Sequence, residues 1–312
     1  MGVNPTYGVG TEASAYTPTV NSLYKMIEKI ARQIIYAPSA DDRLAFFDKI
    51  PINKGTTIEQ VVAKLAESTA FGGSTNDGAD ASDNPFITNY PTLAVKYFNN
   101  WTTKQFTTTV SQQEIRKVIQ GDCSVDDIVG PLVTALTEGD QYEKYTDIKN
   151  LLWYGSQNAA MVKYPTGGIV ETEYTKILNT LKDVISGMQF VNDDFNAAGI
   201  LRRTLPSDIR VIMPYKIKNA IDVNELAGVF NLDKAEIGNR IVEIDDPTTA
   251  GATSAIYVVD QNAVLVYTRL YEMTTLWNPK QLYMNYFLTV ERLFAMSPLF
   301  DAVQIPITTA GG

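Results

Sequence analysis

The side chains that most often do chemistry in proteins are unevenly represented in this chain. It contains no histidine, the commonest general base and a frequent metal ligand because its free pKa lies near neutrality. It contains one cysteine, Cys123, so no disulfide can form within the chain. Ser-His-Asp catalysis, Cys-His catalysis and every histidine-containing zinc site are therefore excluded. Carboxylate, lysine and tyrosine chemistry stay open.

Cys123 is the one residue that could act as a thiolate nucleophile. It directly precedes a predicted helix, whose N-terminal dipole would lower the pKa of the thiol. Three nearby carboxylates, of Asp122, Asp126 and Asp127, oppose a negative charge on sulfur, and no histidine can take its proton. We therefore expect no nucleophilic cysteine.

Oxygen ligands and glycine loops give equally weak signals. Asn192-Asp193-Asp194 and Asp245-Asp246 offer carboxylates, but a calcium loop needs several spaced ligands and a glycine. Gly8-Val9-Gly10 and Gly167-Gly168 lack the spacing of a phosphate-binding loop between a strand and a helix. Both kinds of segment are typical of turns. The sequence thus predicts no catalytic residue, no cofactor site and no metal site.

The composition is that of a folded globular protein. Of 312 residues, 45% are hydrophobic and 20% are charged, and the net charge of −9 gives no general attraction to nucleic acid or to an anionic membrane. No basic and apolar leader opens the chain, and no apolar run approaches the roughly 20 residues of a membrane helix. We expect a protein without membrane association, and the lone cysteine favours a reducing, intracellular setting.

Apolar periodicity predicts an α+β protein. Residues 1–17 show no periodicity, and the Gly-, Ser- and Asp-rich stretch 72–85 predicts an exposed tip or linker. Gly130-Pro131 is expected to bend the longest helix, and Asp260-Gln261-Asn262 is expected to close a hairpin. Spacings of three and four predict helices over 21–35, 58–65, 124–152, 174–185 and 220–230. Short apolar or alternating runs predict strands over 208–213, 240–245, 254–260, 263–268, 282–290 and 302–305.

Residues 93–113, LAVKYFNNWTTKQFTTTVSQQ, form an extended run that is long and decorated on both faces. Aromatic side chains often carry the binding energy of protein interfaces. We therefore predict that this segment packs on a neighbouring chain. Its candidate interface residues are Tyr97, Phe98, Trp101 and Phe106; Trp277 is a further candidate, for which packing in the chain's own core stays open.

The order of these elements resembles the major capsid protein of tailed bacteriophages, the Hong Kong 97-type coat fold. One similar segment runs from Leu288-Thr-Val-Glu-Arg-Leu293 through Pro298 to Ala302-Val-Gln-Ile305. Another is Ser207-Asp-Ile-Arg-Val-Ile-Met-Pro214, followed by a helix and a short apolar strand. The resemblance covers most of the chain by element order and is loose in residue identity.

The resemblance implies a division into four parts. These are an N-terminal arm (1–45), an extended loop (46–115), a peripheral domain with a spine helix (116–165 and 269–297), and an axial domain (166–268 and 298–312). The turn at Asp260, Gln261 and Asn262 would point toward the capsomer axis and contact neighbours there.

The resemblance also implies a structural function without enzymatic activity. The chain would form hexamers and pentamers that tile an icosahedral shell in the virion, made in the host cytoplasm, around double-stranded DNA bound without sequence specificity. Because no long charged helix opens the chain, either scaffolding comes from a separate protein or the chain is already processed. We expect a separate scaffolding protein, with a portal and decoration proteins as further partners. Two alternatives stay open: an encapsulin-like compartment shell, and a carboxylate-dependent hydrolase such as a glycosidase.

Overall fold

The computed structural model describes residues 43–53, 55–66, 90, 92–120, 126–224, 241–245 and 254–308. By their contacts, the residues group into two units, which are described separately. Unit 1 comprises Met1–Lys54, Trp101–Ile148 and Val266–Phe294. Unit 2 comprises Gly55–Asn100, Lys149–Leu265 and Ala295–Gly312. The predictions for 21–35, 72–85 and Cys123 lie outside the described residues.

Unit 1 is built on a three-stranded sheet with the order β3-β10-β9. Its strands are β3 (Trp101–Ser111), β10 (Tyr283–Met296) and β9 (Val264–Asn278). β3 runs antiparallel to β10, from Trp101 opposite Leu293 to Ser111 opposite Tyr283. The long late strand is thus confirmed. The run 93–113 is two strands rather than one, because β2 (Leu93–Phe98) ends before Asn99-Asn100 and belongs to another sheet.

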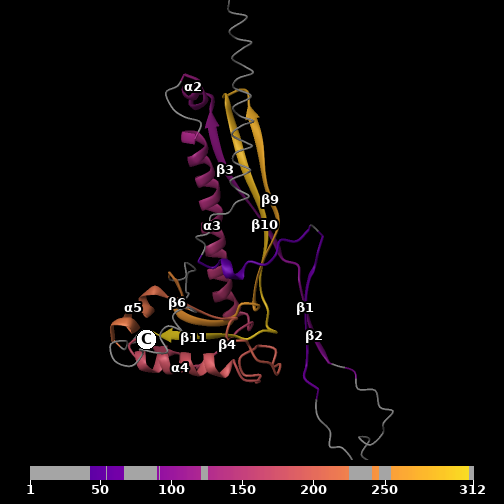
Figure 1. The fold of residues 1–312 in the computed structure, drawn as a ribbon, viewed down its shortest axis with the longest axis vertical. Coiled ribbons are helices and arrows are strands. Elements are labelled where there is room, and N and C mark those ends of the chain that lie inside the picture. Colours follow the sequence, from indigo (N-terminus) through magenta and orange to yellow (C-terminus); the bar gives the residue numbers. More distant parts are fainter. Residues whose placement is uncertain are drawn as a thin grey trace, which may run out of the picture. The chain divides into compact units, whose positions relative to one another are not determined.

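One long helix, α3 (Asp126–Gln157), packs along this sheet (Figure 1). Its 32 residues correspond to about 48 Å at 1.5 Å per residue, and they confirm the helix expected over 124–152. The shared core of unit 1 contains buried side chains from the sheet and from two helices: Val110, Ile115, Leu132, Val133, Leu136, Met273, Tyr286, Leu288 and Val290. Burial alternates along β10 because Tyr286, Leu288 and Val290 all face this core.

A second helix, α2 (Gln112–Gln120), follows β3 and was not expected from the sequence. Its start is a capping box. The backbone amide of Glu114 donates to Ser111 Oγ (3.3 Å), and the backbone amide of Ser111 donates to Glu114 Oε2 (2.7 Å). These bonds satisfy amides that a helix start otherwise leaves without partners. Ile115 at the first turn is fully buried and joins the core of unit 1.

The sheet of unit 2 has six strands with the main order β4-β11-β8-β6-β7, and β5 also pairs with β11. The strands are β4 (Val162–Lys163), β5 (Ile169–Val170), β6 (Ile209–Pro214), β7 (Ile241–Ile244), β8 (Ala255–Asp260) and β11 (Ala302–Thr308). β8 is antiparallel to both β6 and β11. All six residues of β8 are buried, which explains its continuous apolar run.

Two helices, α4 (Tyr174–Gly187) and α5 (Tyr215–Asn224), pack with this sheet into the core of unit 2. The expected apolar stripe of α4 is confirmed by the burial of Ile177, Leu181, Val184 and Ile185. α5 begins directly after the last residue of β6, five residues before the predicted start. Ile217 and Ile221 are buried in the same core, so packing on the sheet extends this helix toward β6.

The expected hairpin at residues 260–262 is wrong. Asp260 and Ala263 do close a turn through a 2.8 Å backbone hydrogen bond. However, β8 pairs with β6 and β11, whereas β9 belongs to the sheet with β10. The two strands are neighbours in sequence only, because each finds its hydrogen-bond partners in a different unit.

The turn expected at Gly167-Gly168 is confirmed. The amide of Gly168 donates to the Pro165 carbonyl at 3.1 Å. Gly168 has a φ of +73°, and a Cβ there would lie 3.2 Å from the Pro306 carbonyl oxygen. Glycine is needed at this position both for its backbone conformation and for the close approach of β11.

A two-stranded antiparallel ribbon, β1 (Ile58–Ala63) with β2, completes unit 2. The helix expected over 58–65 is therefore wrong. Ile58, Val61 and Val62 are β-branched and favour a strand, and β2 provides the partner that the local spacing could not indicate. Its register runs from Ile58 opposite Phe98 to Ala63 opposite Leu93.

Candidate subunit interface

The β1–β2 ribbon has two unlike faces. Because side chains alternate along a strand and the register is known, Val61 and Val95 lie opposite each other on one face. All six side chains of this face are exposed; we call it the ribbon face, and its residues are Glu59, Val61, Ala63, Leu93, Val95 and Tyr97. On the other face, Ile58 and Phe98 are both 8% exposed. The ribbon face is apolar except for one carboxylate and one phenol.

A side-chain hydrogen bond to another segment of unit 2 holds the ribbon near one end. Gln60, on the face opposite the ribbon face, donates from Nε2 to the carbonyl oxygen of Asn262 at 3.3 Å. On the ribbon face, the Tyr97 hydroxyl donates to Glu59 Oε1 at 3.1 Å, and this hydrogen bond to the carboxylate raises the pKa of Tyr97. Isolated two-stranded ribbons are marginal in water. The ribbon thus has one supported face and one exposed apolar face.

The predicted interface residues of 93–113 do not share one environment. Tyr97 is 62% exposed on the ribbon face, whereas Phe98 is buried opposite Ile58. Phe106 packs against the core of unit 1, where a Cβ on Gly139 of α3 would lie 3.4 Å from its ring. Trp277 packs against the same core. Phe98 and Phe106 thus pack within the chain, and the prediction that residues 93–113 also pack on a neighbouring chain stays a prediction.

Trp101 also has a partner within unit 1. The guanidinium carbon of Arg269 lies 4.3 Å from the centroid of its ring, and Arg269 Nη2 pairs with Glu291 at 2.5 Å. Trp101 is half-buried rather than exposed. Two hydrogen bonds link polar side chains on the Trp101 face of this sheet: Thr109 donates to Asn285 at 2.7 Å, and Gln105 donates to Thr289 at 3.2 Å. Thr107 and Thr109 lie on this face, whereas Thr108 lies on the opposite face with Phe106 and Val110.

The turn at 260–262 lies over a buried polar cluster. Asp260 is 2% exposed and accepts hydrogen bonds from the Asn262 amide (2.8 Å) and from Arg202 Nη2 (3.0 Å). Gln261 donates through its amide to the Asp208 carbonyl at 2.9 Å. The side chain of Asp260 thus serves the fold of unit 2, and the contact of this turn with neighbouring subunits stays a prediction.

A second carboxylate completes this cluster. Asp301, 1% exposed, accepts a 2.7 Å hydrogen bond from Thr204 Oγ1, and Arg202 Nε lies 3.7 Å from it. Burial raises the pKa of Asp260; Arg202 opposes the rise, and Asp208 and Asp301 add to it. One guanidinium therefore serves two buried carboxylates.

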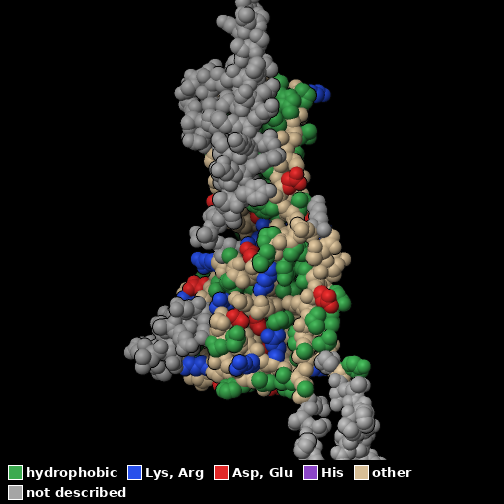
Figure 2. Space-filling view, turned by 45° about the vertical axis from the view of Figure 1, so that its right-hand side comes forward, with side chains coloured by type: hydrophobic (Ala, Val, Ile, Leu, Met, Phe, Trp, Pro, Cys, Tyr) green, Lys and Arg blue, Asp and Glu red, His purple; other side chains and the backbone are tan. Residues whose placement is uncertain are grey.

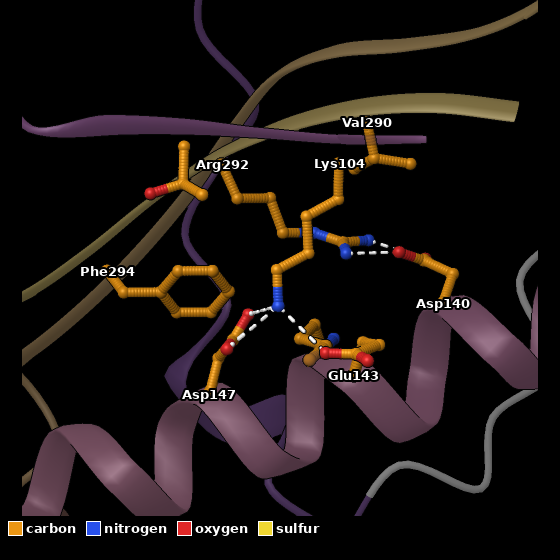
Figure 3. A pocket seen from close by; sticks show the side chains of 9 residues that line it. Lys104, Asp140, Glu143, Asp147, Val290, Arg292 and Phe294 are labelled. Carbon is orange, nitrogen blue, oxygen red and sulfur yellow. Dashed lines mark hydrogen bonds and ion pairs between the residues drawn. The ribbon is translucent and has the colours of Figure 1, made fainter. Parts of the chain in front are cut away.

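Unit 1 contains a different charged cluster, between α3 and its sheet (Figure 3). Lys104 of β3 points between Asp147 (2.7 Å) and Glu143 (2.8 Å) of α3. Arg292 of β10 forms a bidentate pair with Asp140 of α3. Burial lowers the pKa of Lys104, but the hydrogen bonds to Asp147 and Glu143 outweigh it and raise the pKa overall. A small cleft opens here, but Lys104 and Arg292 are already occupied by carboxylates. The cluster joins helix and sheet and leaves little to bind a ligand.

The described residues contain no cluster suited to a metal ion. Asn192 acts as a turn residue, as expected: its Nδ2 donates to the Gly187 carbonyl at 2.7 Å, and its Oδ1 accepts from the Asp194 amide at 3.3 Å. Asp245 pairs with Lys149 at 2.8 Å. Among the helices of the described ranges, none has the length and apolar character needed to span a membrane. The site that remains is a surface, the ribbon face.

Solved structures with the same arrangement of elements are phage capsid proteins. A chain from the capsid structure of Staphylococcus phage Andhra matches with a TM-score of 0.65 and 14% identity, covering 86% of this chain and 84% of that one. A chain from Microbacterium phage Oxtober96 matches with a TM-score of 0.55 and 12% identity, covering 88% and 92%. The protein therefore has the α+β fold of tailed-phage capsid proteins, the Hong Kong 97-type fold.

Sequence comparison identifies the family within this fold. The model of the Phi29-like phage major capsid protein matches residues 7–305, and the chain belongs to that family. The major capsid protein of Bacillus phage GA-1 is 22% identical over 302 residues, 95% of this chain. That of Streptococcus phage Cp-1 is 20% identical over 307 residues, covering 89% of this chain and 80% of its own length. The resemblance seen in the sequence is confirmed, and the compartment-shell and hydrolase alternatives gain no support.

The chain spans about three fifths of the first curated relatives that it matches. The match covers 62% of the GA-1 protein and 61% of the protein of Bacillus phage PZA.

Proposed function

We propose that this chain is the building block of a phage head, assembling as hexamers and pentamers into an icosahedral shell around double-stranded DNA. The observation that carries the proposal is the ribbon face, in a chain that belongs to a major capsid protein family. Val61 is 51% exposed, Leu93 54% and Val95 40%. Burying such side chains is worth on the order of 25 cal/mol per Å². An assembly that repeats this contact at every subunit gains that stabilisation many times.

The charge and the described contacts support a passive relation to the genome. A net charge of −9 gives no general attraction to DNA, and the internal charges of unit 1 are satisfied by one another. We propose that the shell encloses DNA without reading its sequence and has no catalytic role. A separate scaffolding protein, a portal and decoration proteins are proposed as partners during head assembly.

The four-part division is proposed for the assembled subunit. In it, 46–115 provides the extended loop with the ribbon, and 116–165 with 269–297 provides the peripheral domain around α3. Residues 166–268 with 298–312 provide the axial domain, and 1–45 the N-terminal arm. The sheet of unit 2 supports the axial part, since β5, β6, β7, β8 and β11 belong to one sheet with its own core; β4 (Val162–Lys163) of the same sheet falls in the range proposed for the peripheral domain. Of the candidate interface residues, Tyr97 is the one whose exposure supports a direct contact with a neighbour.

The ribbon face provides the test. The double variant Val61→Ser/Val95→Ser removes its apolar centre while keeping small side chains on exposed positions. We expect a folded, unassembled chain, with unchanged circular dichroism and a single small species by size-exclusion chromatography. Electron microscopy should show shells for the unaltered chain, co-produced with scaffold where it is needed.

The matched control is Val61→Ile/Val95→Ile, which keeps the β-branched, apolar character of both positions. It should assemble like the unaltered chain. If the serine variant forms normal shells, the ribbon face is not an intersubunit contact. If the unaltered chain never forms a closed shell or tube, the shell function itself is contradicted.

A further inference from the structure

A segment of unit 2 presents an unusual surface next to the buried polar cluster. Residues 188–192 and 202–204 lie side by side. Asn192 and Arg202 exchange two 3.0 Å backbone hydrogen bonds, and the Thr204 amide donates to the Met188 carbonyl at 2.7 Å. Along this segment burial alternates: Ile200 and Thr204 are buried, whereas Leu201 and Leu205 are exposed. The segment is therefore strand-like, with one inner and one outer side.

The inner side is fixed by the cluster described above. Arg202 bonds to Asp260 and through Nη1 to the Leu299 carbonyl at 3.0 Å, and Thr204 bonds to Asp301. Asn196 closes the neighbouring loop by accepting from the Ile200 amide at 2.8 Å. Buried charges are costly unless they are paired. Here the paired charges hold a segment whose outer side chains are exposed among the described residues.

The outer side is apolar around one cation. Leu201 is 50% exposed and Leu205 is 52% exposed, with exposed Arg203 between them. Val191, 53% exposed, lies across from Arg203 because it precedes the Asn192–Arg202 pair by one residue. We call Val191, Leu201, Arg203 and Leu205 the receiving face. In the sequence, Arg202 and Arg203 look like one small basic cluster, but the strand-like segment points them in opposite directions. Figure 2 shows that hydrophobic side chains do form part of the described surface.

The receiving face is apolar like the ribbon face and carries a charge of the opposite sign. The ribbon face is apolar with one carboxylate, Glu59, and the receiving face is apolar with one guanidinium, Arg203. Both belong to unit 2, and both are exposed in the single chain. Rings of identical subunits need two different complementary surfaces on each copy. We propose that the receiving face binds the ribbon face of a neighbouring copy of this chain, with Glu59 paired to Arg203.

This inference rests on the proposed shell function and names the surface that the ribbon meets. The test is a charge exchange in the full chain. Glu59→Arg and Arg203→Glu each place like charges across the contact, which disfavours association. We expect the yield of shells, counted by electron microscopy, to fall about tenfold or more in each single variant, the equivalent of roughly 1.4 kcal/mol. The double variant Glu59→Arg/Arg203→Glu should recover most of the yield.

Two controls reverse a charge elsewhere on the same unit. Lys96→Glu alters an exposed cation on the opposite face of the ribbon, and Lys163→Glu alters an exposed cation on β4. Both should assemble. Circular dichroism of each unassembled variant establishes that it is folded.

The results of these experiments distinguish the shell function from the pairing of the ribbon face with the receiving face. If both single variants assemble normally while Val61→Ser/Val95→Ser does not, the shell function stands and this pairing is wrong. If the double variant is no better than the worse single variant, the pairing is also wrong. If the unaltered chain does not assemble at all, the proposed function fails first.

Discussion

Single residues in unit 1 show how far its stability depends on paired charges. Asp140 on α3 is 3% exposed, and its bidentate partner Arg292 comes from β10. Removing one member of a buried ion pair leaves an uncompensated charge. The resulting loss of stability is larger than the net stabilisation that the intact pair provides. The pair therefore fixes which part of the helix lies on the sheet.

Arg292→Met should lower the free energy of unfolding by about 3–5 kcal/mol, because Asp140 would stay buried without its partner. The double variant Arg292→Met/Asp140→Leu should recover much of this loss, since both buried charges are then gone. Denaturant unfolding of the unassembled chain measures both. Equal stability of the single variant and the unaltered chain would show that Asp140 is solvated without Arg292.

Trp101→Ala should destabilise the single chain, because the ring contacts Arg269 inside unit 1. Removing a partly desolvated cation–π contact is expected to cost about 1–2 kcal/mol. Tyr97→Ala is the matched control, since Tyr97 is 62% exposed and should leave the unfolding midpoint unchanged while reducing assembly. If Trp101→Ala reduces assembly without any change in the unfolding of the single chain, the stabilising contact of Trp101 with Arg269 is contradicted.

Alkaline pH tests the burial of Tyr257. This side chain is 2% exposed, and burial raises its pKa to about 12, against an ordinary value of 10.0. The unfolded chain loses this proton first, so the contribution is complete below pH 10 and is lost as the pH rises from 10 toward 12. Tyr257→Phe should therefore reduce the fall in unfolding free energy over that range. Tyr271, with a pKa also raised to about 12, accounts for part of the remaining slope. An unchanged slope would show that the pKa of Tyr257 is the same in the folded and the unfolded chain.

Elements differ in how much of their formation is local. The start of α2 is local, because Ser111 and Glu114 exchange hydrogen bonds across the first turn. Ser111→Ala should cost about 1 kcal/mol of unfolding free energy. Gln113→Ala, an exposed change inside the same helix, should have little effect. If the two variants are equally stable, packing of Ile115 rather than the cap fixes this helix.

The distinction between local and long-range contacts explains which elements the sequence could predict. α4 and β8 were predictable because an apolar stripe and an apolar run are local signals. The capping box of Ser111 and Glu114 is also a local signal, but it lies at the end of an extended run rich in β-branched and aromatic residues. The strand β1 was not predictable from its spacing, since its partner residues in β2 lie 30 to 40 positions further along the chain. The false hairpin after β8 has the same cause, because its strands pair with β11 and β10 instead.

Interface residues were harder to predict than elements. The sequence pattern favoured aromatic side chains, yet Phe98 and Phe106 pack within the chain, and Trp277 follows the core-packing alternative left open for it. The ribbon face is mainly aliphatic, and it is visible only once the register places Val61 beside Val95. The receiving face needs the Asn192–Arg202 pairing in the same way. Exposure is set by contacts between distant segments, and no local pattern encodes it.

At the scale of the whole molecule, the two faces of unit 2 make a directional subunit. A contact between two different surfaces leaves one of each unused in a dimer, so a further copy can always add until a ring closes. A contact of a surface with itself stops at two copies. Because Cys123 is the only cysteine in the chain, its replacement leaves introduced cysteines as the only thiols, and disulfide linkage can then distinguish the two kinds of contact.

The variant Glu59→Cys/Arg203→Cys, in a Cys123→Ser background, places one thiol on each face. Oxidation of assembled shells should link each copy to the next, giving a denaturing-gel ladder that extends well beyond the dimer and collapses on reduction. A mixture of the two single-cysteine variants should stop at the dimer, because each copy then carries one thiol. A double variant that also stops at the dimer would indicate a self-complementary contact. Absence of any linkage in intact shells would place the ribbon on another surface of its neighbour.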